Sequence, residues 1–260
     1  MRILMASNVY PPHFVGGAEL IAHEHAKALV ALGHEVEVFA GEIHAFGEHQ
    51  AIRHDVLDGI PVHRISMLPR DYQSEFVNFA HPAIEAHFQH VLEAFRPDVF
   101  HGHNLVGLSV LLPHLARQAG CAVVLTLHDH WGYCFKNTII KEGLRICVDF
   151  TGCAECMATI DDGAARAIPI RLRKDFFSLM LSDVDAFVSP SRYLADSYRK
   201  AGFPPVKLHV LWNGVALERF RKVRGEPSAG ELRLTYVGIL AHHKGVATLM
   251  VALEIGRAHV

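Results

Sequence analysis

Strand-like and helix-like segments alternate along the first 214 residues, and this alternation is the feature that most limits the fold. Residues 2–7 (RILMAS) are continuously apolar, as in a strand that is buried on both faces. Residues 16–33 repeat apolar side chains at helical spacing and end in a glycine. We expect further strands at 34–41, 61–68, 98–104, 121–128, 185–191 and 207–214, a helix at 79–95, and helical stretches between most strands. The pattern predicts an α/β fold with a doubly wound, parallel, Rossmann-like sheet.

A second folding unit is expected to begin near residue 232. Residues 221–231 are polar and rich in glycine, proline and charge, which is typical of a linker. Residues 232–240 (LRLTYVGIL) then indicate a new strand, and 245–253 (GVATLMVAL) a new helix. The expected divisions are a first domain over 1–222, a linker over 223–231, and the start of a second domain over 232–260.

The last residues depart from this pattern. Residues 254–260 (EIGRAHV) lose the apolar helical spacing of 246–253, and codons that encode them can be written so as to resemble a sequencing adapter. One strand and one helix cannot bury a core of their own. We therefore expect the natural protein to continue and the tail to be an artefact; the alternative is a genuine short tail.

Composition excludes several classes of function. Half of the 260 residues are hydrophobic, and the net charge is −2 with 20 histidines taken as neutral, so nothing indicates nucleic-acid binding. The first residues lack the basic head, long apolar stretch and cleavage site of a signal peptide. No stretch is apolar for long enough to span a bilayer. We expect a soluble cytoplasmic protein whose five cysteines are thiols or metal ligands.

Polar side chains follow the expected strands, at the edge where a parallel sheet binds its ligands. Histidines in HGHN (101–104) and TLHDHW (126–131) can donate to a sugar hydroxyl or stabilise charge in a transition state. Strand geometry should turn His101 and His103 to the same side. A single histidine among 20 is more often a surface or packed residue, and only the strand-end location singles out His103 and His128. The full set of strand-end residues is Asn8, His103, Asn104, His128, Asp129, Ser189, Asn213 and Gly214.

Two glycine-containing segments could hold phosphate. Gly16 and Gly17 lie just before a helix, where backbone N–H groups and the helix dipole attract an anion. The alternative is a turn that only needs positive φ, and the dinucleotide fingerprint G-x-G-x-x-G is absent. In YVGILAHHKG (236–245), Lys244 could hold a diphosphate as a point charge while Gly238 lets the backbone approach.

Four cysteines fall within a segment (131–163) that carries few signals of regular structure. Cys153 and Cys156 have zinc-knuckle spacing, and Cys134 and Cys147 could complete a four-thiolate site. The alternative is four free thiols, although a loop of this length needs a staple to stay ordered. The remaining cysteine, Cys121, begins an expected buried strand and is assigned to the core.

A basic, amphipathic stretch, RLRKDFF (171–177), lies on an expected helix. It could touch anionic lipid. The favoured interpretation is an ordinary helix with a solvated basic face.

Taken together, five stretches resemble glycosyltransferase family 4. They are PPHFVGGAE, DVFHGHN, TLHDHW, the long run from VDAFVSPSRY to LWNGV, and YVGILAHHKG. The resemblance covers nearly the whole chain to about residue 253, and the cysteine spacing after TLHDHW resembles a subset of the family. It implies retaining enzymes that use a nucleotide-diphosphate sugar and consist of two facing Rossmann-like domains, the GT-B architecture. The first domain would bind a glycan or lipid-linked acceptor and the second the donor.

The resemblance also implies roles for single residues. Gly16 and Gly17 would lie beside the donor diphosphate, together with Asn213, Gly214 and Gly238. His103 would face the transferred sugar, and His128 with Asp129 would line the cleft. Lys244 would neutralise the leaving diphosphate, so no catalytic metal is expected.

Two departures from the family pattern limit what the chain should do. Ile239 stands where many members have arginine, so the diphosphate would depend more on Lys244. The family's paired glutamates, which hold the donor, would lie beyond residue 260. We therefore expect these 260 residues to bind donor poorly and to turn over little or nothing.

Three interpretations follow for the function. The favoured one is a glycosyltransferase of envelope polysaccharide synthesis, cytoplasmic and at the inner face of the membrane if its acceptor is lipid-linked. The second is a non-catalytic Rossmann-like binding module with a zinc-stapled loop. A third, an NAD-dependent oxidoreductase, fits the alternation but lacks the glycine fingerprint and a ribose-binding acid.

Overall fold

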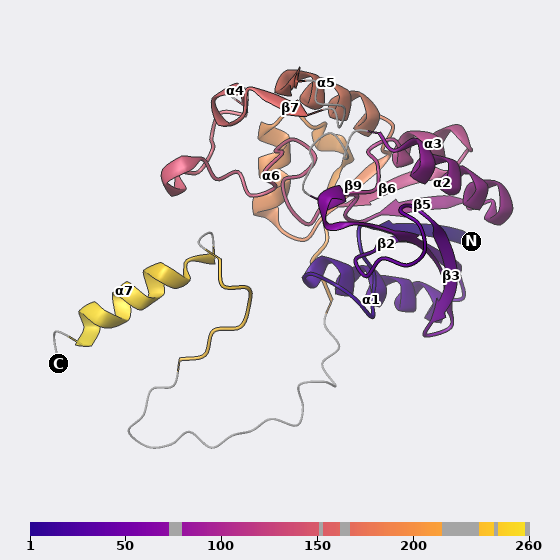
Figure 1. Ribbon diagram of the computed structural model, residues 1–260, viewed down its shortest axis with the longest axis horizontal. Helices are drawn as coiled ribbons and strands as arrows, with labels where there is room; N and C mark the ends of the chain where they lie inside the picture. Colours follow the sequence, from indigo (N-terminus) through magenta and orange to yellow (C-terminus); the bar gives the residue numbers. More distant parts are fainter. Residues whose placement is uncertain (73–79, 151–152, 162–166, 215–233, 242–243, 258–260) are drawn as a thin grey trace, which may run out of the picture. The chain divides into compact units, whose positions relative to one another are not determined.

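Figure 1 shows the computed structural model, which describes residues 1–72, 80–150, 153–161, 167–214, 234–241 and 244–257. The chain divides into two compact units. The first contains residues 1–139 and 147–213, and the second contains residues 140–146 and 214–260. The expected boundary at residue 222 and the linker at 223–231 lie outside the described residues.

The first unit is built on an eight-stranded sheet with the strand order β10-β9-β6-β5-β1-β2-β4-β3. Every neighbouring pair is parallel except β3 and β4. Because the chain winds outward from β1 in both directions, the β1–β5 junction is the topological switch point of the sheet. The prediction of a doubly wound, Rossmann-like α/β fold is confirmed. The strands are β1 (Arg2–Ser7), β2 (Glu35–Glu42), β3 (Ile52–Leu57), β4 (Ile60–Ser66), β5 (Val99–Gly102), β6 (Ala122–Thr126), β9 (Ala186–Ser189) and β10 (Leu208–Val210).

Helices cover both faces of the sheet, with α1 on one side and α2 and α3 on the other (Figure 1). Alternate side chains of β1 enter the two cores: Met5 packs with residues of α1, and Leu4 packs with residues of α2. Burial on both faces explains why RILMAS is continuously apolar. The helices of this unit are α1 (Gly17–Ala31), α2 (Pro82–Phe95), α3 (Leu112–Gln118), α4 (Cys153–Cys156), α5 (Ile170–Leu181) and α6 (Arg192–Lys200), with short 3-10 turns at η1 (Pro69–Tyr72) and η4 (Pro205–Lys207).

Two hairpins were not predicted. β3 pairs antiparallel with β4 through a turn at Asp58 and Gly59, whose φ angles are 50° and 79°. An Asp-Gly pair is a strong signal for such a turn, so the sequence did contain the information. The second hairpin joins β7 (Thr159–Asp161) to β8 (Ala167–Pro169) and gives the end of the cysteine-containing segment regular structure.

The second unit contains a helix but, among its described residues, no strand. α7 (Val246–Arg257) confirms the helix expected over 245–253 and continues beyond it, although the pattern of 254–260 indicated a break. The strand expected over 232–240 is absent from residues 234–240. A strand needs a neighbouring strand to satisfy its backbone groups, and the described residues of this unit supply none. A short 3-10 turn, η3 (Glu142–Leu144), also belongs to this unit.

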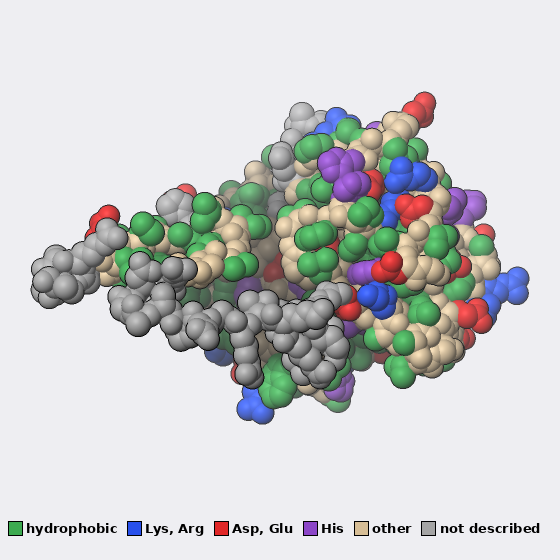
Figure 2. All heavy atoms as spheres, turned by 90° about the horizontal axis from the view of Figure 1, so that it is seen from below, with side chains coloured by type: hydrophobic (Ala, Val, Ile, Leu, Met, Phe, Trp, Pro, Cys, Tyr) green, Lys and Arg blue, Asp and Glu red, His purple; other side chains and the backbone are tan. Residues whose placement is uncertain are grey.

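No described helix is both long enough and apolar enough to cross a bilayer. On the face seen in Figure 2, basic and acidic side chains lie interspersed. This mixed surface agrees with the small net charge of −2.

Candidate active site

Four histidines meet on the sheet where β5 and β6 end. His101 and His103 have ring centroids 4.5 Å apart, which confirms that they point to the same side. The His25 ring of α1 lies 5.3 Å from the His103 ring, and the His128 ring stacks on His103 at 5.2 Å. His103 Nδ1 and His128 Nε2 are within hydrogen-bond distance at 3.0 Å, and His101 Nε2 lies 2.8 Å from Thr126 Oγ1.

Burial keeps these imidazoles neutral. Burial, together with neighbouring histidines, lowers the pKa of His101 to about 3 and that of His128 to about 4. The pKa of His103 falls well below its ordinary value for the same two reasons, and burial also lowers that of His25. A neutral imidazole offers one donor and one acceptor, so the cluster suits hydroxyl groups better than anions.

One buried atom of the cluster has no partner among the described residues, namely His103 Nε2. Buried polar atoms in folded proteins are almost always hydrogen-bonded, so a missing partner points to a ligand or a water. A cavity of about 20 Å³ lies beside His103, His128 and Asp129, with room for about one water molecule.

Asp129 follows His128 in the loop after β6. Its carboxylate accepts a hydrogen bond from the backbone N–H of Trp131 at 2.7 Å. Burial nevertheless raises the pKa of Asp129 to about 6, with Glu19 adding to the rise and Arg173 opposing it. Tyr198 of α6 fixes this loop, because its hydroxyl donates to the carbonyl of Asp129 and accepts from the N–H of Gly132, each at 3.1 Å.

The basic helix differs from its expected form. In α5, Arg171 is exposed and pairs with Asp175, but Arg173 is 1% exposed. The Arg173 guanidinium lies 3.8 Å from the centre of the Phe177 ring and donates to the Trp131 carbonyl at 3.1 Å. The expectation of a solvated basic face therefore holds for Arg171 but is wrong for Arg173. Arg173 shares the buried stripe with Ile170, Phe177 and Leu181, and this helical spacing is the signal that could have identified it.

The glycine pair begins α1 without unusual backbone angles. Gly16 is extended, with φ at −152°, so positive φ is not the reason for glycine there. Its N–H donates to the carboxylate of Glu19 at 2.9 Å, and Glu19 is itself 3% exposed. A side chain added at Gly17 would meet nothing within 4 Å, so the backbone there is accessible. An anion bound at Gly16 would therefore have to replace the Glu19 carboxylate.

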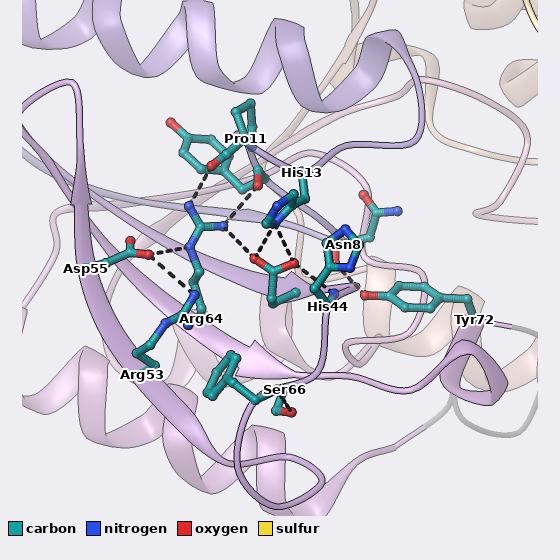
Figure 3. Close-up of polar contacts among 12 residues, drawn as sticks. Asn8, Pro11, His13, His44, Arg53, Asp55, Arg64, Ser66 and Tyr72 are labelled. Atoms are coloured by element: carbon teal, nitrogen blue, oxygen red, sulfur yellow. Dashed lines mark hydrogen bonds and ion pairs between the residues drawn. The ribbon is translucent and has the colours of Figure 1, made fainter.

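A buried arginine holds the loop between β1 and α1 in place (Figure 3). Arg64 of β4 is 1% exposed and donates to the carbonyls of Tyr10 and Pro11, at 3.0 Å and 2.5 Å. Its Nε donates to Asp55 at 2.7 Å, and Nη1 lies 3.7 Å from the Glu42 carboxylate. Sequence reasoning missed this network, because residues from three strands and a loop meet only in the folded sheet.

The remaining predicted donor-binding residues are not gathered at the histidine cluster by any described contact. β10 ends at Val210, so Asn213 and Gly214 lie in an exposed stretch after the strand. Gly238 and Lys244 belong to the second unit, where Gly238 has a φ of 148° and Lys244 is exposed. Their roles stay predictions.

The cysteine segment is ordered mainly by packing. Cys134 and Cys147 pack against the main core, whereas Cys153 and Cys156 pack against a small cluster of Phe135, Ile160 and Ile170. Burial raises the pKa of Cys134 and Cys153; the Cys153 thiol adds to the rise at Cys134, and the Cys147 and Cys156 thiols add to the rise at Cys153. Among the described residues, no three His, Cys, Asp or Glu side chains converge as metal ligands. The zinc site stays a prediction. Cys121 is buried in the main core, as expected.

The fold resembles solved sugar-transferring enzymes. Trehalose-6-phosphate synthase OtsA superposes with a TM-score of 0.52 at 14% identity, covering 98% of this chain and 55% of that one. Sucrose-phosphate synthase from Thermosynechococcus elongatus gives 0.51 at 12% identity, covering 85% of this chain and 93% of that one. At these identities, the likeness shows the fold alone.

Similar sequences include a 42.6 kDa protein in the cps region of Klebsiella pneumoniae, 24% identical over 94% of this chain and 63% of that protein. A phosphatidylinositol N-acetylglucosaminyltransferase component from Arabidopsis thaliana is 24% identical over 96% of this chain and 48% of that protein. The chain thus spans about half to three-fifths of the length of these curated relatives. The sequence profile of Glycosyltransferase Family 4 matches residues 15–219, which include the histidine cluster, and the chain belongs to that family.

Proposed function

We propose that this chain is part of a retaining glycosyltransferase that moves a sugar from a nucleotide-diphosphate sugar to a glycan or lipid-linked acceptor. In this reaction the bond between the anomeric carbon and the phosphate oxygen breaks, and its electron pair leaves with the diphosphate. The acceptor hydroxyl forms the new bond and releases its proton. Negative charge grows on the leaving group, so fixed donors and cations there lower the barrier.

The observation that carries the proposal is the unpartnered Nε2 of buried His103. A hydroxyl of the transferred sugar would satisfy this nitrogen, and the neutral state of the cluster favours such a contact over one with an anion. His128 would orient His103 through the 3.0 Å contact between the two rings. Asp129 would line the cleft beside them.

The diphosphate would be held by other groups. Gly16 and Gly17 would offer backbone N–H groups at the start of α1, with the diphosphate taking the place of the Glu19 carboxylate on Gly16. Lys244 would neutralise the leaving group, and Asn213, Gly214 and Gly238 would line the remainder of the donor site. Residues 232–260 would then belong to the donor-binding domain of a GT-B enzyme.

Two similar proteins support the choice of substrates. A trehalose-6-phosphate synthase from E. coli with a TM-score of 0.50 was solved with UDP-2-fluoro glucose, which supports a nucleotide-sugar donor. The Klebsiella relative lies in a cps region, which supports a role in envelope polysaccharide synthesis. With a lipid-linked acceptor, the enzyme would work at the inner face of the membrane.

The test begins with the gene. Genomic DNA is read past the codon for Leu253, and the encoded protein is assayed for release of sugar from UDP-glucose, UDP-N-acetylglucosamine and GDP-mannose. His103→Ala should lower kcat at least about 100-fold, a loss typical of removing one hydrogen-bonding group from a transition state.

The matched variant His90→Ala changes an exposed histidine of α2 and should keep full activity. Full activity of His103→Ala would overturn the assigned role, and absence of transfer from all three donors would favour a non-catalytic binding module.

A further inference from the structure

A second imidazole site lies on the same edge of the sheet as the histidine cluster, on the loop that precedes α1. His13 Nδ1 lies 3.0 Å and 3.1 Å from the two carboxylate oxygens of Glu42, at the end of β2 (Figure 3). The His13 side chain is 42% exposed, whereas the Glu42 side chain is 2% exposed. One partner of this pair is therefore fixed in the interior, and the other faces solvent.

The partners of Glu42 fix the proton on His13. The carboxylate accepts the backbone N–H of His44 at 2.9 Å and faces the Arg64 guanidinium at 3.7 Å, so its other neighbours are hydrogen-bond donors. An ionised carboxylate only accepts hydrogen bonds, so His13 must donate its Nδ1–H. Nε2 of the neutral ring then carries the lone pair. It makes no hydrogen bond to any described residue.

The loop that carries His13 is held rigidly, so this lone pair has a fixed direction. Arg64 binds the carbonyls of Tyr10 and Pro11. The buried Tyr10 hydroxyl lies 2.8 Å from His23 Nδ1, and the His44 ring packs edge-on against His13 at 4.2 Å. Binding groups held by packing and by further hydrogen bonds lose little entropy when a ligand arrives.

The two residues after His13 make the surface beside it apolar. Phe14 and Val15 are 46% and 61% exposed. Carbohydrates present hydroxyls at the ring edge and C–H groups on the ring faces, so a fixed lone pair beside exposed apolar side chains suits them. An anionic ligand would meet the Glu42 carboxylate behind the His13 ring.

We infer that His13 is an acceptor-binding residue whose Nε2 accepts a hydrogen bond from a hydroxyl of the acceptor sugar. Glu42 is a positioning residue that acts through His13 by holding its Nδ1–H tautomer. The site is distinct from the His103 cluster, although both lie at the carboxyl ends of the strands. The inference rests on the proposed function, because it names the acceptor site of the same reaction.

The first test uses NMR on the 260-residue chain. Long-range ¹⁵N–¹H correlation spectra, assigned with His13→Phe, should show the Nδ1–H tautomer for His13 at pH 8. Methyl glycosides of glucose, galactose, mannose and N-acetylglucosamine are then titrated as probes. At least one should shift the Nε2 resonance of His13. An Nε2–H tautomer, or no shift with any of the four probes, would overturn the inference.

Variants separate binding from folding. His13→Phe keeps a ring but no lone pair, and should weaken binding of the responding glycoside about tenfold, as expected for loss of one hydrogen bond. His13→Gln can still donate to Glu42 and accept through its amide oxygen, so it should keep most of the affinity. The matched control His90→Phe changes an exposed histidine whose Nδ1 lies 2.8 Å from the Ala86 carbonyl, and should have no effect. Equal losses in the Phe and Gln variants would indicate a purely structural role and overturn the inference.

The inference and the proposed function fail in different experiments. If the gene product transfers sugar and His13→Phe leaves the acceptor KM unchanged, the acceptor site is wrong and the transferase stands. If glycoside binding depends on His13 but no donor yields transfer, the binding site stands and the proposed transferase is wrong.

Discussion

Asp129 occupies a place that favours its protonated form. Burial raises its pKa to about 6 from an ordinary value of 3.8, despite the hydrogen bond from Trp131. The unfolded chain therefore releases this proton first, and the free energy of unfolding should fall as the pH rises from about 4 to about 6. Such destabilisation is common at functional sites, where a group is held for chemistry rather than for stability.

Asp129→Asn should remove the free-energy cost of burying an ionised carboxylate and keep the oxygen that accepts the Trp131 N–H. A pKa difference of about two units corresponds to a gain of up to about 3 kcal/mol at pH 8, fading toward pH 4. Urea unfolding at pH 4.5, 6 and 8 would measure it. The control Asp196→Asn changes a side chain that is 58% exposed and should shift the free energy of unfolding by less than about 0.5 kcal/mol. A gain that does not depend on pH would contradict the argument.

At the scale of residues, the sequence predicted what strand geometry alone determines. The shared side of His101 and His103 follows from side-chain alternation. The arrival of His25 from α1 does not, because it depends on how a helix is rotated on the sheet. Arg64 and Glu42 were missed for the same reason, since their meeting requires the register of β2 and β4.

At the scale of elements, buried parallel strands were recognised more easily than the edge of the sheet. β1 is buried on both faces and stands out as an apolar run, whereas β3 is an edge strand without a buried residue. Its polar sequence hides the strand, and only the Asp58–Gly59 turn reveals the hairpin. The strand expected at 232–240 shows the opposite error, because an apolar run does not form a strand without a partner.

The Asp58–Gly59 turn gives a matched pair of glycine substitutions. Gly59 has a φ of 79°, a conformation that costs a residue with Cβ roughly 1 kcal/mol or more. Gly59→Ala should therefore destabilise the chain by about that amount. Gly17→Ala adds a methyl group into open space at the first residue of α1, where φ is not positive, and should be neutral or slightly stabilising. Urea unfolding of both variants tests the assignment, and equal effects would show that backbone conformation is not the cause.

At the scale of the whole molecule, the first unit contains every partner that its own sheet requires. All eight strands and the three hydrophobic clusters lie within residues 1–213. The described residues of the second unit contribute a helix and no strand to the chain. Stability of the sheet should therefore be a property of the first unit.

A chain shortened to residues 1–213 should consequently keep the free energy of unfolding of the 260-residue chain within about 1 kcal/mol, because no strand pairing or cluster residue is removed. A matched chain that ends at Lys207 loses β10 and the buried side chain of Leu208, and leaves β9 as an edge strand. It should lose about 2 kcal/mol or more from Leu208 alone. Urea unfolding followed by far-UV circular dichroism would compare the three chains. If the 1–213 chain is as unstable as the shorter one, residues 214–260 stabilise the sheet, and the second unit would have to be treated as integral to the fold of the first.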